Sequence, residues 1–243
     1  MTTPPDNPVP AADPGDTPET ALQLALDQTS LAGAARIVTR LAPALSRVEI
    51  GTPLAIAAGL SAIEHIRQLT RPATAIVADV KICDAGERIA RSAFAAGANV
   101  VTVVAAAVDE VTWRGVLEAA GDRGRGDGGP APVLVDTIGS GTDPAALGVL
   151  AAAAAEAGVR VDLCVHRPKA ASPGFADLIR PLIRHDLGFD RLVVAGQLGP
   201  AEVRPALEAG FGTLVVGGAV ANADDPMTVW NMFRAEVRAW GRG

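Results

Sequence analysis

The chain has 243 residues, 49% of them hydrophobic, and a formal net charge of -6. This length suits one large domain or two small ones, with enough apolar residues for a sizeable core. The acidic balance and the lack of a basic block exclude nucleic acid as an expected partner. No apolar stretch is long and pure enough to span a membrane.

The first 20 residues are rich in Pro, Asp and Thr and contain no apolar signal segment, so we expect a disordered tail there. The chain contains two cysteines, Cys83 and Cys164, and their spacing fits no metal-binding motif. This cysteine usage favours a reduced, cytoplasmic protein.

After the tail, strand-like and helix-like segments alternate along the chain. We expect strands at residues 22–27, 47–51, 74–80, 99–104, 133–138, 161–166, 192–195 and 213–216. We expect helices, in the same order, at residues 31–45, 53–69, 86–96, 111–120, 144–157, 174–187, 201–209 and 226–240. The Gly-, Arg- and Asp-rich stretch 121–132 is expected to form a mobile surface loop.

Eight strand–helix units predict a (β/α)8 TIM barrel, a single α/β domain over residues 21–243. A doubly wound open sheet is the alternative. That fold would favour a glycine-rich turn after the first strand, where this chain has Asp27-Gln28-Thr29-Ser30.

In such barrels the active site lies at the carboxyl ends of the strands. Polar residues converge on these predicted strand ends: Asp27, Glu49, Asp79, Lys81, Asp84, Asp136 and His166. A single acid at a strand end is commonly a helix cap or a loop anchor. Five acids with a lysine and a histidine at one rim instead indicate a functional site.

The run Asp79-Val80-Lys81-Ile82-Cys83-Asp84 is the most informative of these segments. Residues two apart in a strand point to the same face, so we expect Asp79 and Lys81 to project together. Two carboxylates and an ammonium this close are costly to bury unless each is paired. A surface salt bridge at a strand end is the simpler alternative.

Four blocks of the chain together resemble the orotidine-5'-phosphate decarboxylase suprafamily. The branch most similar is that of 3-hexulose-6-phosphate synthase and 3-keto-L-gulonate-6-phosphate decarboxylase. The matching blocks are Leu22–Asp27, Val48–Pro53, Ala78–Gly86 and the segment from Val215 to Pro226.

The resemblance implies an enediolate of a sugar phosphate and a divalent metal, usually Mg²⁺, held by Glu49 and Asp79. Carboxylate oxygens are the ligands that Mg²⁺ prefers. It further implies that Lys81 supplies positive charge beside the metal, that Asp27 contacts the sugar hydroxyls, and that His166 transfers a proton.

The same resemblance implies a homodimer, because Asp84 would reach into the partner's active site. It places the substrate's phosphate at the backbone of Gly217 and Gly218, with Gly196 and Gln197 beside it. Gln197 departs from the family's usual second glycine, so its side chain would either crowd the phosphate or contact it.

Different features of the resemblance favour different substrates. Asp136, the Val48–Pro53 block and the last matching block favour the synthase, which adds formaldehyde to ribulose 5-phosphate. His166-Arg167 resembles a pair found in the decarboxylases, and Arg167 and Lys169 would add charge near the substrate's far end. A relative acting on another sugar phosphate, or a non-catalytic barrel that binds one, are the remaining alternatives.

Overall fold

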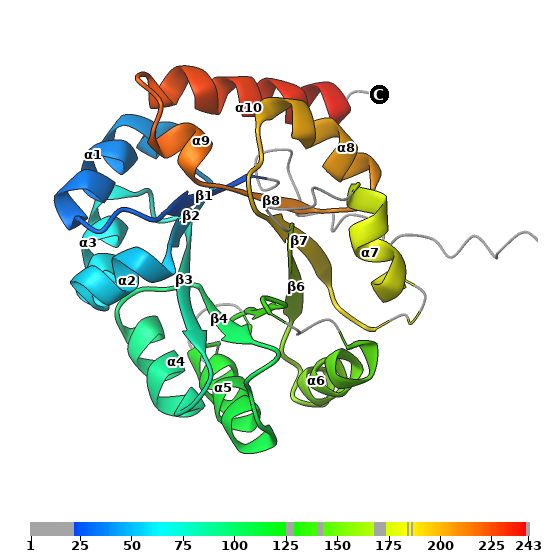
Figure 1. The fold of residues 1–243 in the computed structure, drawn as a ribbon. Helices are drawn as coiled ribbons and strands as arrows, with labels where there is room; N and C mark the ends of the chain where they lie inside the picture. Colours follow the sequence, from blue (N-terminus) through cyan, green and yellow to red (C-terminus); the bar gives the residue numbers. More distant parts are fainter. Residues whose placement is uncertain are drawn as a thin grey trace, which may run out of the picture.

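Eight parallel strands, hydrogen-bonded in sequence order, close into a barrel in the computed structural model, where β8 pairs with β1 (Figure 1). The model describes residues 22–124, 129–139, 143–167, 174–183, 185 and 187–241. The strands are β1 (Leu22–Leu26), β2 (Arg47–Ile50), β3 (Ala75–Ile82), β4 (Val100–Val104), β5 (Val133–Asp136), β6 (Val161–His166), β7 (Arg191–Ala195) and β8 (Thr213–Val216). The expected TIM barrel is therefore confirmed.

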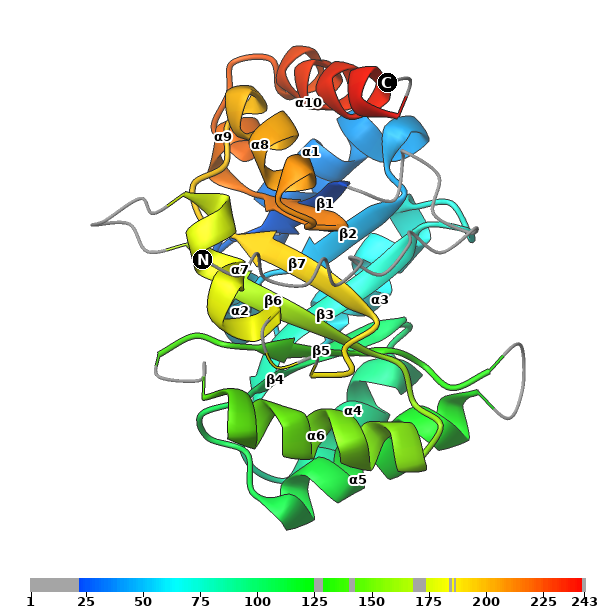
Figure 2. The ribbon, with the colours of Figure 1, turned by 90° about the vertical axis from the view of Figure 1, so that its right-hand side faces the viewer.

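Helices surround the barrel and connect successive strands (Figures 1 and 2). The α-helices are α1 (Leu31–Leu41), α2 (Thr52–Ala58), α3 (Ser61–Leu69), α4 (Gly86–Ala95), α5 (Glu110–Arg123), α6 (Pro144–Glu156), α7 (Phe175–Ile183), α8 (Val203–Glu208), α9 (Gly218–Ala221) and α10 (Pro226–Trp240). Short 3-10 turns, η1 (Ala42–Ala44) and η2 (Pro200–Glu202), follow α1 and precede α8. No described helix has the length and apolarity that crossing a membrane requires.

The structure corrects several expected boundaries. The helix expected at residues 53–69 is two helices, because Gly59 adopts a left-handed φ of 66° between α2 and α3. The expected loop 121–132 begins later, since α5 continues to Arg123. The helix expected at residues 174–187 ends at Ile183, and α9 was not predicted. The proposed tail, residues 1–20, lies outside the described residues.

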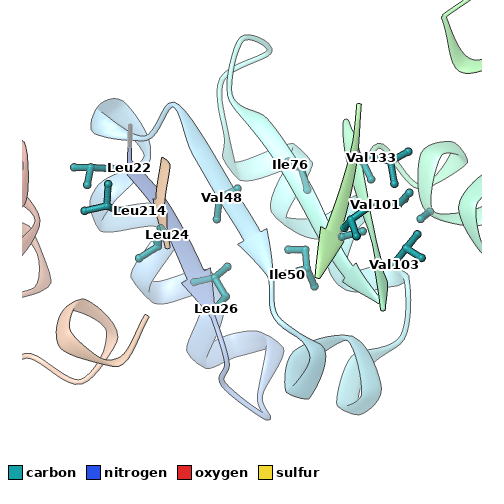
Figure 3. Packing of buried hydrophobic residues seen from close by; sticks show 14 of the residues in the cluster. Leu22, Leu24, Leu26, Val48, Ile50, Ile76, Val101, Val103, Val133 and Leu214 are labelled. Carbon is teal, nitrogen blue, oxygen red and sulfur yellow. The ribbon is translucent and has the colours of Figure 1, made fainter. Parts of the chain in front are cut away.

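Side chains along each strand point alternately toward the helices and into the barrel, and this produces two separate buried layers. Leu22, Leu24 and Leu26 of β1 face the helices, where they join Val48, Ile50 and Leu214 in one apolar cluster (Figure 3). The intervening positions point into the barrel. A separate small cluster fills the barrel interior: Ala25, Val77, Val100, Leu134, Cys164, Val193, Ala195 and Val215. The polar residues described next continue these inward-facing rows.

Candidate active site

A bulge in β3 shapes the signature segment. Ala78 pairs with Val101 of β4, whereas Ile82 pairs with Val103, so β3 carries two extra residues between these contacts. Lys81 adopts a left-handed φ of 45° within this bulge. Bulges of this kind occur at barrel rims next to active sites, where they re-aim a side chain. Asp79 and Lys81 do meet, as predicted, but through the bulge and not through simple alternation.

Asp79 is held by hydrogen bonds on both carboxylate oxygens. Its Oδ1 accepts from the Thr102 hydroxyl at 2.9 Å, and its Oδ2 accepts from the Thr52 hydroxyl at 2.7 Å. The backbone N–H of Lys81 in turn donates to Thr102 Oγ1 at 2.9 Å. Asp79 is buried, so these partners fix the direction of its carboxylate inside the barrel mouth.

The Lys81 ammonium lies between two carboxylates. Its Nζ is 2.9 Å from Asp79 Oδ1 and 2.7 Å from Asp136 Oδ2, and its side chain is only 23% exposed. Burial alone would lower the pKa of Lys81, but the attraction of the two carboxylates outweighs it and raises the pKa above its usual range. Lys81 is therefore a fixed positive charge at neutral pH, and the alternative of a solvated surface salt bridge does not describe it.

Asp136 connects Lys81 to His166. The Nε2 atom of His166 lies 3.0 Å from Asp136 Oδ1 and 3.1 Å from Oδ2. Burial would raise the pKa of Asp136, but its bonds to His166 and Lys81 lower it below the usual value. An ionised carboxylate only accepts hydrogen bonds, so Nε2 of His166 carries a proton and Nδ1 is the nitrogen left for other partners.

Within the described part of the chain, Glu49 and Asp27 are acids that form no ion pair. Burial raises the pKa of Glu49 to about 8, and the negative charges of Asp79 and Asp27 add to this effect. Partial burial, followed by the charge of Asp79, also raises the pKa of Asp27. The one hydrogen bond formed to the Glu49 carboxylate within the described residues comes from the amide of Gln23.

Asp27 lines a cavity of about 630 Å³. A side chain at Gly51 would place its Cβ only 2.1 Å from Asp27 Oδ1, so the glycine is required for this carboxylate to lie against β2. Asp27 also borders Gly217. The cavity is lined by the β1–α1 loop and by α1 and α9, including Asp27, Ser30, Arg36, Gly218 and Asn222. Its volume falls within the range of small-molecule sites.

The β7–α8 connection packs closely against the backbone at the carboxyl end of β6. Gly196 has a φ of 107°, and a Cβ there would lie 2.7 Å from the backbone oxygen of Arg167. Gln197 also adopts a left-handed φ, of 50°, which is unusual for a residue with a side chain. The Gln197 side chain is exposed, so the structure places it at the rim without burying it against the barrel.

Two other predicted site residues lie away from the Lys81 cluster. The Arg167 guanidinium packs over the ring of Phe175, 4.9 Å from its centroid. Asp84 is exposed, and its carboxylate accepts a hydrogen bond from the N–H of Ala85 at 2.6 Å. Lys169 lies outside the described residues.

The donor set fits a hard divalent cation. Three carboxylates, from Asp27, Glu49 and Asp79, interact electrostatically around a single ammonium; burial is the main cause of the raised pKa of Glu49, and the charges of Asp79 and Asp27 raise it further. Carboxylate oxygens are the ligands Mg²⁺ takes, so the donor types of these residues suit the expected metal. Another group, Asp136, Cys164 and His166, brings its ligand atoms within 4.8 Å of one another. It suits a cation less well, because Asp136 already binds both Lys81 and His166, and burial keeps the Cys164 thiol's pKa well above its usual range.

The sequence reasoning missed four polar residues at or below the site. Thr52 and Thr102 orient Asp79. Gln23 donates a hydrogen bond to Glu49, and Arg47 donates one to Gln23. The alternation of inward- and outward-facing side chains along each strand could have revealed Gln23 and Arg47. Gln23 lies two residues before inward-facing Ala25, and Arg47 two residues before Glu49.

Comparison with known proteins agrees with this geometry. The model of the orotidine 5'-phosphate decarboxylase / HUMPS family matches residues 20–233. The chain belongs to this family. Among curated members, it is 34% identical to 3-keto-L-gulonate-6-phosphate decarboxylase of Escherichia coli, covering 90% of this chain and 96% of that protein. It is 33% identical to 3-hexulose-6-phosphate synthase of Mycobacterium gastri, covering 89% and 99%.

Solved structures of the orotidine 5'-phosphate decarboxylase / HUMPS family share the fold throughout. KGPDC from Streptococcus mutans in complex with D-R5P superimposes with a TM-score of 0.75 at 25% identity, covering 90% of this chain and 98% of that chain. A 3-hexulose-6-phosphate synthase structure gives a TM-score of 0.72 at 30% identity, covering 89% and 99%. The branch expected from the four sequence blocks is confirmed.

Proposed function

We propose that this chain is a metal-dependent lyase that acts on a ketose phosphate through an enediolate, with 3-hexulose-6-phosphate synthase as the leading activity. The observation that carries the proposal is the Lys81 ammonium between Asp79 and Asp136, beside the uncompensated acids Glu49 and Asp27. Fixed positive charge at this place stabilises negative charge that develops on substrate oxygens.

Each residue then has a chemical task in the leading reaction. A proton leaves C1 of ribulose 5-phosphate, the resulting enediolate carbon bonds to formaldehyde, and the new alkoxide oxygen takes up a proton. Lys81 lies beside the developing charge. His166 exchanges protons at Nδ1, because Asp136 holds the proton on Nε2. Asp27, which lines the cavity, binds sugar hydroxyls.

Glu49 and Asp79 would hold the divalent cation, for which Mg²⁺ is the first candidate. When bound, the cation supplies further positive charge to the enediolate oxygens. The excess of carboxylate over ammonium charge around Lys81 supports this assignment.

The phosphate end of the substrate is assigned to the β7 and β8 loops, with Gly196, Gln197, Gly217 and Gly218 as its neighbours. Gly218 lines the same cavity as Asp27, which supports a single ligand spanning both. Arg167 contributes to the substrate's far end only if its guanidinium leaves the Phe175 ring.

The two candidate substrates are supported by different observations. Asp136 and the last matching block favour the synthase. The His166-Arg167 pair, together with 34% identity to the E. coli decarboxylase, favours 3-keto-L-gulonate 6-phosphate as the alternative. Parallel assays with Mg²⁺ separate them: formaldehyde loss with ribulose 5-phosphate supports the synthase, and CO₂ release from the keto acid supports the decarboxylase. Turnover of neither sugar phosphate would contradict both activities and favour the remaining alternatives, a relative acting on another sugar phosphate or a non-catalytic barrel.

A cytoplasmic homodimer is part of the proposal, with Asp84 of each chain acting in its partner's site. The exposure of Asp84 supports this role. If it is correct, inactive Asp84→Ala and Lys81→Ala chains should recover part of the activity after they are mixed and exchange subunits. Mixtures that form dimers but stay inactive would argue for self-contained sites.

A further inference from the structure

A row of polar side chains lies in the barrel interior below the site. Gln23, Arg47, Asp162 and Thr213 are all buried and occupy the amino-terminal halves of β1, β2, β6 and β8. This end of a TIM barrel ordinarily contributes stability and not chemistry. Polar groups buried there require a reason, because each must replace the hydrogen bonds it loses to water.

Two of these groups, Arg47 and Gln23, form a hydrogen-bonded chain that ends at Glu49 in the site. The Arg47 Nε–H donates to Gln23 Oε1 at 3.1 Å, and the Gln23 amide nitrogen donates to Glu49 Oε2. All three residues are buried, with Arg47 only 6% exposed. A continuous hydrogen-bonded connection therefore runs from Arg47, in the amino-terminal layer of the barrel interior (the barrel floor), to Glu49 in the site.

Arg47 determines the orientation of the Gln23 amide. A guanidinium has only donors, so the Gln23 carbonyl oxygen must face it and the amide nitrogen must point away. The nitrogen then faces Glu49, which must be ionised to bind a cation and in that form only accepts hydrogen bonds. Without Arg47 the amide would be free to turn its oxygen toward Glu49, where two acceptors would oppose each other.

Burial lowers the pKa of Arg47, and the positive charges of Arg191 and Arg160 lower it further, while the attraction of Asp162 acts in the opposite direction. Arg47 Nη2 and both Asp162 carboxylate oxygens have no hydrogen-bond partner among the described residues. Such groups are commonly completed by buried water. Among the described residues, the Nε bond to Gln23 is thus the defined hydrogen bond of Arg47.

We propose that Arg47 is a positioning residue which, through Gln23, holds the Glu49 carboxylate in the orientation that binds the divalent cation. The inference rests on the cation assigned to Glu49 in the proposed function. It adds two residues, Gln23 and Arg47, that contact neither substrate nor metal. Partners of this kind typically change metal affinity by about 10- to 100-fold when removed.

Calorimetric titration of the substrate-free protein with Mn²⁺ tests the proposal. Arg47→Met should weaken Mn²⁺ binding by about 10- to 100-fold, while Arg47→Lys, which keeps a donor and the charge, should retain most of the affinity. The direction in which the Mn²⁺ affinity changes distinguishes a positioning role of Arg47 from a purely electrostatic one. If Arg47 acted only through its positive charge, its removal would strengthen cation binding. Thr213→Val is the matched control, since it removes a buried polar group of the same layer and should leave the affinity unchanged.

Gln23→Met provides a second route if Arg47→Met does not fold. It should weaken Mn²⁺ binding similarly, and the double variant should be no weaker than Gln23→Met alone, because both changes break one chain. Equal affinity in wild type and a folded Arg47→Met or Gln23→Met protein would overturn this inference alone. A wild-type protein that binds no Mn²⁺ would overturn the metal assignment in the proposed function and this inference with it.

Discussion

The ammonium of Lys81 lies 2.7 Å from the carboxylate of Asp136, although 55 residues separate them in the sequence. The β3 bulge brings the lysine across the barrel mouth, and β5 supplies the acid from its last position. Asp136 in turn bonds His166. One carboxylate thus fixes both the charge beside the reacting oxygens and the tautomer of the histidine.

Lys81→Met should lower kcat by about 10²- to 10³-fold, because it removes a charge that stabilises the transition state. KM for the sugar phosphate should change far less, since the phosphate is assigned to other loops. Steady-state kinetics measures both. Arg91→Met, which removes an exposed cation of α4, is the control and should change neither. A variant in which only KM rises would make Lys81 a binding residue.

Asp136→Asn should remove a stabilisation that depends on pH. The folded-state pKa of Asp136 is lowered, so the unfolded chain binds more protons, and the stabilising effect is present above about pH 4 and lost as pH falls below it. The free energy of unfolding, measured with urea, should therefore differ between wild type and variant at pH 7. The difference should shrink toward pH 3. A difference that stays constant over this range would contradict the assigned interaction.

The two cysteines should differ in reactivity. Cys83 is exposed, whereas Cys164 is buried and its burial raises the pKa of the thiol well above its usual range. Thiolates are the reactive form. A disulfide reagent should therefore modify one thiol per native chain and two after denaturation, and Cys83→Ser should abolish the native reaction. Rapid modification of both thiols in the folded protein would contradict the barrel interior described for β6.

Gln197→Gly should stabilise the fold while weakening substrate binding. Its left-handed φ of 50° carries a steric cost of about 1 kcal/mol that glycine does not have. If the exposed side chain contacts the phosphate, KM should rise in the same variant. Thermal unfolding and kinetics give the two values. A lower KM would mean that Gln197 crowds the phosphate.

The order of strands and helices followed from the sequence because each unit carries its own periodicity and stop signals. The strand-end acids followed from the same pattern, since parallel strands bring their carboxyl ends to one rim. The bulge at Lys81 did not, because it depends on how β3 and β4 pair, which is a tertiary property. The separation of α2 from α3 depends on the left-handed conformation of Gly59, and a glycine alone does not specify that.

The barrel floor was accessible to sequence reasoning but was overlooked. Gln23 and Arg47 occupy the inward-facing rows of β1 and β2, and polar residues in such rows are a signal in themselves. What the rows could not supply is the direction of the Gln23 amide, which only the contact with Arg47 determines.

The most direct measurement is proton exchange at C1 of ribulose 5-phosphate in D₂O with Mg²⁺ and no formaldehyde, followed by NMR. Removal of the C1 proton forms the enediolate on which the leading activity depends. The account predicts deuterium incorporation at C1 that EDTA abolishes and that a folded Asp79→Asn variant lacks. No exchange in wild type, or equal exchange in Asp79→Asn, would contradict metal-dependent enediolate chemistry at this site.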